Sequence, residues 1–199
     1  MQLYARHREP RRALDPAPPF PYNAPLTFRG PALKAHIDYE AAFEDYLQTR
    51  QIPYVAVDEA KRAAFREARL KSFDFIVYSA AGPNWLVDIT GRRWAARRGA
   101  RRPAWENWVT QADLDGLRQW QQVFGSGFAA LLVFGYRLDA AGAPPADVIH
   151  TFRDARYVFA GIPLDEYQAQ ARLRSPKWGT VNMPVPEFAR QVRPIADWL

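Results

Sequence analysis

The chain lacks cysteine altogether, so its 199 residues contain neither a disulfide bond nor a cysteine-ligated zinc site. Histidine is scarce as well. His7, His36 and His150 lie far apart and do not have the short spacing of metal-binding histidine motifs. These absences exclude the zinc folds that are recognised from cysteine and histidine patterns.

Long hydrophobic runs are also missing, since no apolar segment approaches the length that spans a bilayer. Residues 1–12 are charged and are not followed by the apolar segment of a secretory signal. We therefore expect a cytoplasmic protein that does not contact a membrane. Hydrophobic residues make up 48% of the chain, which favours a packed core over a disordered chain.

Basic residues exceed acidic residues, with 27 Lys and Arg against 21 Asp and Glu and a net charge of +6. Most of the basic residues are arginine, which binds phosphate with two parallel hydrogen bonds and stacks on bases. The excess favours nucleic acid as a partner. An arginine-rich proteome produces the same composition, so charge alone does not decide the function.

Proline divides the chain into two parts. Residues 1–33 contain seven prolines and predict an extended arm. Residues 34–199 predict a single domain with a core at 36–138 and a C-terminal extension at 139–199.

Hydrophobic periodicity predicts the elements of this domain. We expect a helix from about residue 35 to residue 50, a strand at 52–57 and a charged connection at 58–70. Two further strands, 72–78 and 84–90, form a hairpin, and a basic loop follows from Gly91 to about Asn107. Thr110 is expected to cap a helix at 111–124 together with Asp113, in a capping box, and the helix is expected to end at Gly125.

The rest of the chain adds an almost wholly apolar strand at 130–138, strands within 148–154 and 156–163, and a short helix at 164–173. The order helix, three strands, helix, strand predicts an α/β fold. Its small mixed sheet is flanked by helices, with segment 130–138 returning beside the central strands.

Two acids interrupt the apolar strands of the hairpin. Asp74 lies in SFDFIVY and Asp88 in NWLVDITGRRW. A carboxylate in such surroundings is costly unless it has a partner. One interpretation is a pair of carboxylates that holds a hard divalent cation. The other is two ordinary half-buried acids, held by an arginine or by backbone NH groups.

Further polar residues lie at related positions. Thr90 is two residues beyond Asp88, so both side chains leave the same face of their strand. Glu40 and Glu44 are one helical turn apart and can point the same way. Gln111 lies in the first turn of the second helix.

The order Glu40, Asp74, Asp88, Gln111 on helix, strand, strand and helix resembles the PD-(D/E)XK nuclease superfamily, and its Holliday-junction-resolvase-like branch in particular. The string DYEAAFEDYL at 38–47 also resembles the signature of the HYExAFE family, although Asp38 stands where the signature has histidine. The tail RSPKWGTV at 174–181 resembles the same family. The main resemblance covers residues 36–138.

The resemblance implies a restriction-endonuclease-like α-β-β-β-α-β core and a Mg²⁺- or Mn²⁺-dependent endonuclease. Asp74, Asp88 and Glu40 would hold the cation, and Gln111 would face the site. It further implies DNA as the substrate, branched DNA among the candidates, and a homodimer as a possible assembly.

Thr90 departs from the superfamily pattern, which has lysine there to stabilise charge in the transition state. Three interpretations stay open. A lysine from elsewhere, Lys71 or Lys61, supplies the charge, or Arg92 or Arg93 supplies it from just past the strand. In the third, the protein binds nucleic acid or a protein partner and does not cut.

The basic loop carries six arginines, which we expect to contact DNA phosphates: Arg92, Arg93, Arg97, Arg98, Arg101 and Arg102. Its tryptophans would stack on bases, or would instead pack on the core beneath a solvated loop. The segment RLRSPKW at 172–178 is a second basic and aromatic patch, which on its own indicates surface rather than a site. A protein-interaction role, with the proline-rich arm docking on a partner, is the remaining alternative.

Overall fold

The computed structural model describes residues 37–57, 71–95, 104–139, 144 and 148–199, all of them in the unit Lys34–Leu199. The expected arm at 1–33, the connection at 58–70 with Lys61, and Arg97, Arg98, Arg101 and Arg102 lie outside the described residues. In chain order the elements are α1 Ile37–Thr49, β1 Tyr54–Ala56, β2 Phe75–Val77, β3 Asn84–Trp94, β4 Val109–Thr110, α2 Gln111–Phe124, β5 Phe128–Leu138, β6 His150–Phe152, β7 Ala155–Pro163, α3 Leu164–Gln170, β8 Arg172–Ser175, η2 Pro176–Trp178, β9 Thr180–Asn182, α4 Val185–Gln191, β10 Arg193–Pro194 and η3 Ile195–Asp197.

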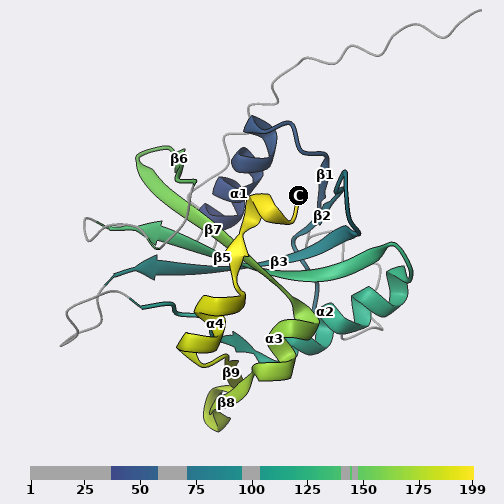
Figure 1. Ribbon diagram of the computed structural model, residues 1–199, viewed down its shortest axis with the longest axis vertical. Coiled ribbons are helices and arrows are strands. Elements are labelled where there is room, and N and C mark those ends of the chain that lie inside the picture. Colours follow the sequence, from purple (N-terminus) through teal and green to yellow (C-terminus); the bar gives the residue numbers. More distant parts are fainter. Residues whose placement is uncertain (1–36, 58–70, 96–103, 140–143, 145–147) are drawn as a thin grey trace, which may run out of the picture. The chain divides into compact units, whose positions relative to one another are not determined.

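The main sheet has seven strands in the described residues, in the order β1-β2-β3-β5-β7-β10, with β6 added beside β7. The pair β3–β5 is parallel and the other pairs are antiparallel. Parallel neighbours need a crossover connection, and α2 provides it between β3 and β5. The predicted mixed sheet, flanked by helices and built in the order α-β-β-β-α-β, is therefore confirmed (Figure 1).

The parallel pair β3–β5 is the longest in the sheet and runs unbroken from Asn84↔Phe128 to Trp94↔Leu138. The sequence predicted that the third strand would end at Thr90 and that a loop would begin at Gly91. For residues 91–94 that prediction is wrong. β5 offers each of these residues a partner, and the Trp94 ring is buried against Tyr136.

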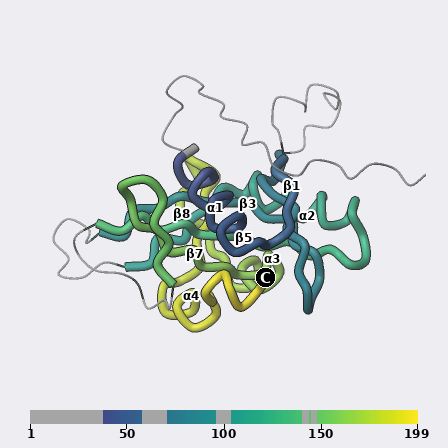
Figure 2. Tube along the Cα trace, turned by 90° about the horizontal axis from the view of Figure 1, so that it is seen from above, coloured from purple at the N-terminus to yellow at the C-terminus, as the bar shows by residue number. Residues whose placement is uncertain are grey.

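Helices cover both faces of the sheet. α1 lies over β3 and β5 (Figures 1 and 2), where Phe43 and Tyr46 pack with Val87 and Leu131. On the other face, α2, α3 and α4 contribute apolar side chains to a second cluster. Burial on both faces explains why β5 reads as a nearly continuous apolar run.

Two glycines allow α1 to approach the sheet closely. Gly91 of β3 and Gly135 of β5 are register partners. A Cβ atom on Gly91 would collide with the Tyr39 ring, and one on Gly135 would lie 3.3 Å from Tyr39 Cδ1. The Tyr39 hydroxyl then donates to the Arg92 carbonyl at 3.0 Å. The ring of Tyr39 thus occupies space that two side chains would otherwise fill.

The ends of α2 follow their local sequence signals. The Thr110 hydroxyl accepts from the Asp113 amide, and the Asp113 carboxylate accepts from the Thr110 amide, which confirms the predicted capping box. At the other end the helix stops at Gly125, whose φ of 71° lies in the region that favours glycine.

The C-terminal extension forms further secondary structure. β6 and β7 confirm the strands expected in this region. The helix expected at 164–173 is shorter than predicted, because Arg172–Ser175 pairs with β9. Strands β4, β9 and β8 form a second sheet of three strands. No helix among the described residues is long and apolar enough to cross a bilayer.

Two buried tyrosines attach the segment before β4 to the core. The Tyr136 hydroxyl donates to the Glu106 carbonyl at 3.0 Å, and the Tyr167 hydroxyl donates to the Asn107 carbonyl at 2.5 Å. Burial raises the pKa of both phenols. The pKa of nearby Arg92 shifts in the opposite direction, since burial lowers it to about 10.

We expect the folded state to lose stability above about pH 10, the ordinary pKa of tyrosine. Below that pH both phenols are protonated in the folded and unfolded chains. Above it the unfolded chain releases protons that folded Tyr136 and Tyr167 retain, so unfolding becomes easier. Arg92 changes stability in the opposite direction, but it is one group against six described tyrosines whose pKa burial raises. Urea denaturation at a series of pH values measures the effect.

Tyr136→Phe should reduce this alkaline loss, because it removes one of the retained protons. Tyr78→Phe is the control, since Tyr78 is 41% exposed. A free energy of unfolding that is unchanged between about pH 9 and pH 11 would contradict the assignment.

Candidate functional site

Asp74 lies immediately before β2 and is attached to its neighbours by its backbone and its side chain. Its amide donates to the Val87 carbonyl at 2.8 Å, and its carbonyl accepts from the Val57 amide at 2.8 Å. Its carboxylate Oδ2 accepts from the Ile89 amide at 2.7 Å. The pairing of β2 with β3 ends at Val87, and the Asp74 carboxylate then serves as the acceptor for the next β3 amide on this side, that of Ile89.

The alternation of side chains breaks at Asp74. Phe73 belongs to the cluster beneath α2, whereas Phe75, two residues on, belongs to the cluster beneath α1. A regular strand would place both on one face. Phe73 and Asp74 precede β2, so the regular alternation of the strand begins only at Phe75.

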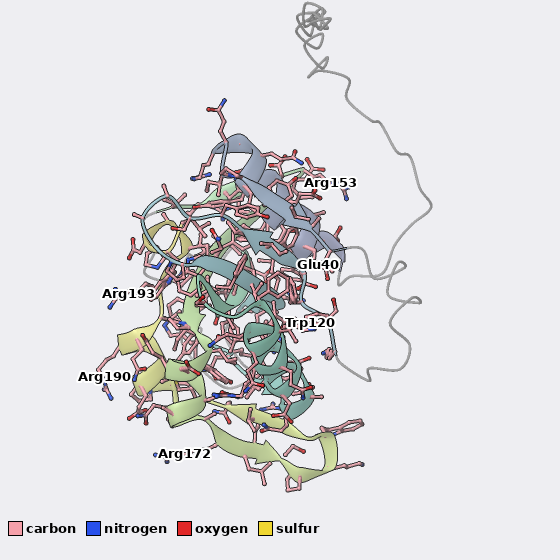
Figure 3. The ribbon with its side chains drawn as sticks, turned by 90° about the vertical axis from the view of Figure 1, so that its right-hand side faces the viewer. Glu40, Trp120, Arg153, Arg172, Arg190 and Arg193 are labelled. Carbon is pink, nitrogen blue, oxygen red and sulfur yellow. The ribbon has the colours of Figure 1, made fainter. Side chains whose placement is uncertain are left out.

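The Asp74 side chain lies on the side of α1. Asp74 lines a hollow of about 170 Å³ together with Glu40 and Glu44. Figure 3 shows Glu40 on α1 at the side of the molecule that faces the viewer. The Glu44 carboxylate accepts from the Tyr54 hydroxyl at 2.8 Å. Both glutamates that the sequence offered for the site therefore face Asp74.

Asp88 occupies the strand next to this hollow, at a half-buried position. Its neighbours Val87 and Ile89 pack beneath α1, so strand alternation directs Asp88 and Thr90 toward the face covered by α2. Asp74 and Asp88 are linked through the backbone of β3, because the Asp74 carboxylate accepts from the amide of Ile89, the residue after Asp88. That the two carboxylates point to one spot stays a prediction from the sequence.

Asp113, which caps α2, pairs with Lys71 on the α2 side of the sheet. The Lys71 ammonium forms an ion pair with the Asp113 carboxylate, and the Lys71 carbonyl accepts from the Trp120 indole at 2.9 Å. Gly116 lets this segment pass close to α2, because a Cβ there would lie 2.7 Å from the Lys71 carbonyl.

Gln111 is separate from the acidic hollow. Its side-chain amide donates to Asp115 at 2.9 Å. It lines a different hollow, of about 310 Å³, together with residues of α3, β8 and β9. Of the residues proposed from the sequence, Glu40, Glu44 and Asp74 share one hollow, Asp88 does not line it, and Gln111 lines another.

The two described arginines of the basic loop differ in exposure. Arg93 is exposed and forms an ion pair with Asp139 at 2.8 Å. Arg92 is half-buried: its guanidinium lies 3.8 Å from the centre of the Trp108 ring and donates to the Trp108 and Gly91 carbonyls.

The tryptophans near the basic loop serve the core. Trp94 and Trp105 lie 5.1 Å apart, edge to face, and Trp105 also packs on Tyr136 and Phe188. Of the two roles considered for these rings, packing on the core is the one observed.

We call Glu40, Glu44 and Asp74, together with Asp88 on neighbouring β3, the acidic corner. Its carboxylate oxygens are the donors that a hard divalent cation prefers. In the described part of the chain, however, no three acidic or histidine side chains form a ready-made metal cluster. The acidic corner therefore offers the type of oxygen ligand that Mg²⁺ or Mn²⁺ prefers. The described side chains do not form a complete set of ligands around one point.

No protein-family profile matches the chain, and no curated protein sequence is significantly similar to it. Among solved structures, the chain is similar to Hjc, a Holliday junction resolvase from the archaeal hyperthermophile Archaeoglobus fulgidus. The two share 10% sequence identity with a TM-score of 0.49, and the alignment covers 81% of this chain and 98% of that one. Similarity of this size assigns neither family nor activity, and membership of the HYExAFE family stays a prediction.

The bond between Asp74 and the Ile89 amide predicts a difference between two variants. Asp74→Ala leaves a strand-edge amide without its acceptor and should lower the free energy of unfolding by about 1–3 kcal/mol. Asp74→Asn retains an acceptor oxygen and should lose much less. Urea denaturation of both variants measures the difference, with Glu166→Ala on the exposed side of α3 as the control. Equal losses for the two Asp74 variants would show that this hydrogen bond is not the cause.

Proposed function

We propose that the protein is a PD-(D/E)XK-like, metal-dependent phosphodiesterase that acts on DNA. One observation carries the proposal. The carboxylates of Glu40 and Asp74 line one hollow, and Asp74 accepts from the amide of Ile89, the residue after Asp88. This observation is independent of the arginine-rich composition, which by itself did not decide the function.

In this proposal Glu40, Asp74 and Asp88 hold the cation, Mg²⁺ or Mn²⁺. When bound, the cation lowers the pKa of a coordinated water and neutralises charge on the scissile phosphate. The Ile89 amide fixes Asp74 through its 2.7 Å bond, which orients the carboxylate before any cation binds. The chain itself thus contributes preorganised oxygen donors on rigid elements.

A second candidate is a DNA-binding relative that does not cut. Thr90 occupies the position of the motif lysine, and three of the cations considered as substitutes already have partners, while Lys61 lies outside the described residues. Lys71 is paired with Asp113, Arg92 with Trp108, and Arg93 with Asp139. These contacts favour weak or absent hydrolysis over a relocated catalytic lysine. A homodimer and a cytoplasmic location stay predictions from the sequence.

The nuclease proposal predicts that Mg²⁺ or Mn²⁺ supports cleavage of duplex, flap or four-way DNA and that EDTA abolishes it. Asp88→Asn and Asp74→Asn should each reduce the cleavage rate by roughly a hundredfold or more. The asparagine variant is chosen at Asp74 because it keeps an acceptor for the Ile89 amide. Glu166→Gln is the matched control. Cleavage that persists in EDTA or in both aspartate variants would contradict a carboxylate-bound cation.

Thr90→Lys separates the two candidates. If the site is a nuclease that has lost its lysine, this change should create or increase metal-dependent cleavage, because Thr90 shares its face with Asp88. The gain should disappear again in the double variant Thr90→Lys with Asp88→Asn. Wild-type cleavage that Thr90→Lys fails to improve would instead show that the charge is supplied from elsewhere. Thermal melting confirms that each variant is folded.

A further inference from the structure

The hairpin of β8 and β9, with the turn η2 between them, is strongly basic and projects from the lower end of the domain (Figures 1 and 3). We call residues 172–182 the basic arm. It contains Arg172, Arg174 and Lys177 and no acidic residue. All three cations are exposed. Such a surface is complementary to a polyanion.

Trp178, at the tip of the basic arm, is the most exposed of the described large hydrophobic side chains, at 70%. Leu173 of the same arm is 66% exposed. The Lys177 ammonium lies 5.3 Å from the centre of the Trp178 ring. Tryptophan usually buries most of its surface, so an exposed ring beside a cation suggests a stacking surface for a ligand.

The tip of the basic arm is held rigidly. Gly179 follows Trp178 with a φ of 54°, and its carbonyl accepts from the Gln111 amide at 2.8 Å. β9 pairs with both β8 and β4, and its Val181 belongs to the core. Trp178 is therefore presented by an ordered turn, which lowers the entropy cost of binding.

The basic arm is also connected to the strand that carries Asp88. The register shifts between Leu173 and Ser175, which leaves Arg174 outside the pairing with β9. The Arg174 guanidinium lies 5.2 Å from the centre of the Trp108 ring, and the Arg92 guanidinium lies 3.8 Å from it. Arg92 belongs to β3, four residues beyond Asp88. Contacts thus connect β3 through Trp108 to the arm.

We propose that the basic arm binds a single-stranded segment of the DNA substrate, with Trp178 stacked on an unpaired base. Arg172, Arg174 and Lys177 contact the phosphates on either side. Stacking requires an open base face, which duplex DNA offers only at ends and branches, so the arm favours branched or frayed DNA. The inference rests on the proposed function for the choice of DNA, and it narrows the substrate class.

Stacking is tested by binding in EDTA, where no metal-dependent cleavage occurs. The probe is a flap DNA with 2-aminopurine in the unpaired strand, whose fluorescence is quenched by stacking. We expect quenching by wild type and by Trp178→Phe and its loss in Trp178→Ala, with affinity weakened about tenfold or more. Val123→Ala is the control, because Val123 is an apolar side chain on α2 with 67% exposure. Equal quenching by wild type and Trp178→Ala would overturn the proposal.

The phosphate contacts are tested by salt dependence. The arm variant, with Arg172, Arg174 and Lys177 changed to alanine, should reduce the slope of log affinity against log salt by about 2. The control variant changes Arg50, Arg153 and Arg156 to alanine, three exposed arginines that remove the same charge away from the arm. Figure 3 shows Arg153 at the opposite end of the domain from Arg172. Equal slopes for the arm and control variants would show general charge attraction and overturn the proposal.

The two proposals fail in different ways. If wild type cleaves DNA but the arm and Trp178→Ala variants bind and cleave flap DNA as wild type does, the arm inference is wrong and the nuclease stands. If wild type never cleaves but these variants lose binding in EDTA, the arm inference stands and the nuclease is wrong. Absence of any binding by wild type overturns the arm inference, and cleavage is then judged by its own assay. Thermal melting of every variant excludes misfolding.

Discussion

The parallel pairing of β3 with β5 is the contact on which the rest of the structure depends. Each of the eleven residues of β3 has a partner in β5, and both faces of the pair are buried. Because parallel strands cannot be joined by a tight turn, the pairing requires α2 as a crossover. It thereby places the capped start of α2 beside Lys71 and carries Asp88, Thr90 and Arg92 in line along one face.

Elements with strong local signals were predictable from the sequence. The capping residues Thr110 and Asp113 predict the start of α2, and Gly125 predicts its end. Residues 91–94 of β3 had no local signal for a strand. Their partners in β5 lie some forty residues later, and two charged arginines interrupt the apolar pattern. β4, β8 and β9, of two to four residues each, are too short for any periodicity to show.

At the candidate site the sequence offered the acids and the elements that carry them, but the face on which each side chain lies depends on packing. The tripeptide Phe73-Asp74-Phe75 reads as regular alternation, yet its two rings pack on opposite faces because the strand begins only at Phe75. The tryptophans show a similar limit. Trp94 and Trp178 both stand beside basic residues in the sequence, yet the first is 6% exposed and the second 70%. Tertiary packing, which no local pattern encodes, decides between them.

The glycine pair beneath Tyr39 has a consequence for the acidic corner. Glu40 follows Tyr39 in α1, so the height of the Tyr39 ring above β3 and β5 sets how far the Glu40 carboxylate stands from Asp74. Because Gly91 and Gly135 have no side chain, the Tyr39 ring rests directly on the backbone of β3 and β5. A methyl group on either would raise the helix and widen the hollow without altering any acid. The separation between donors in this corner is therefore encoded partly by two residues that have no side chain.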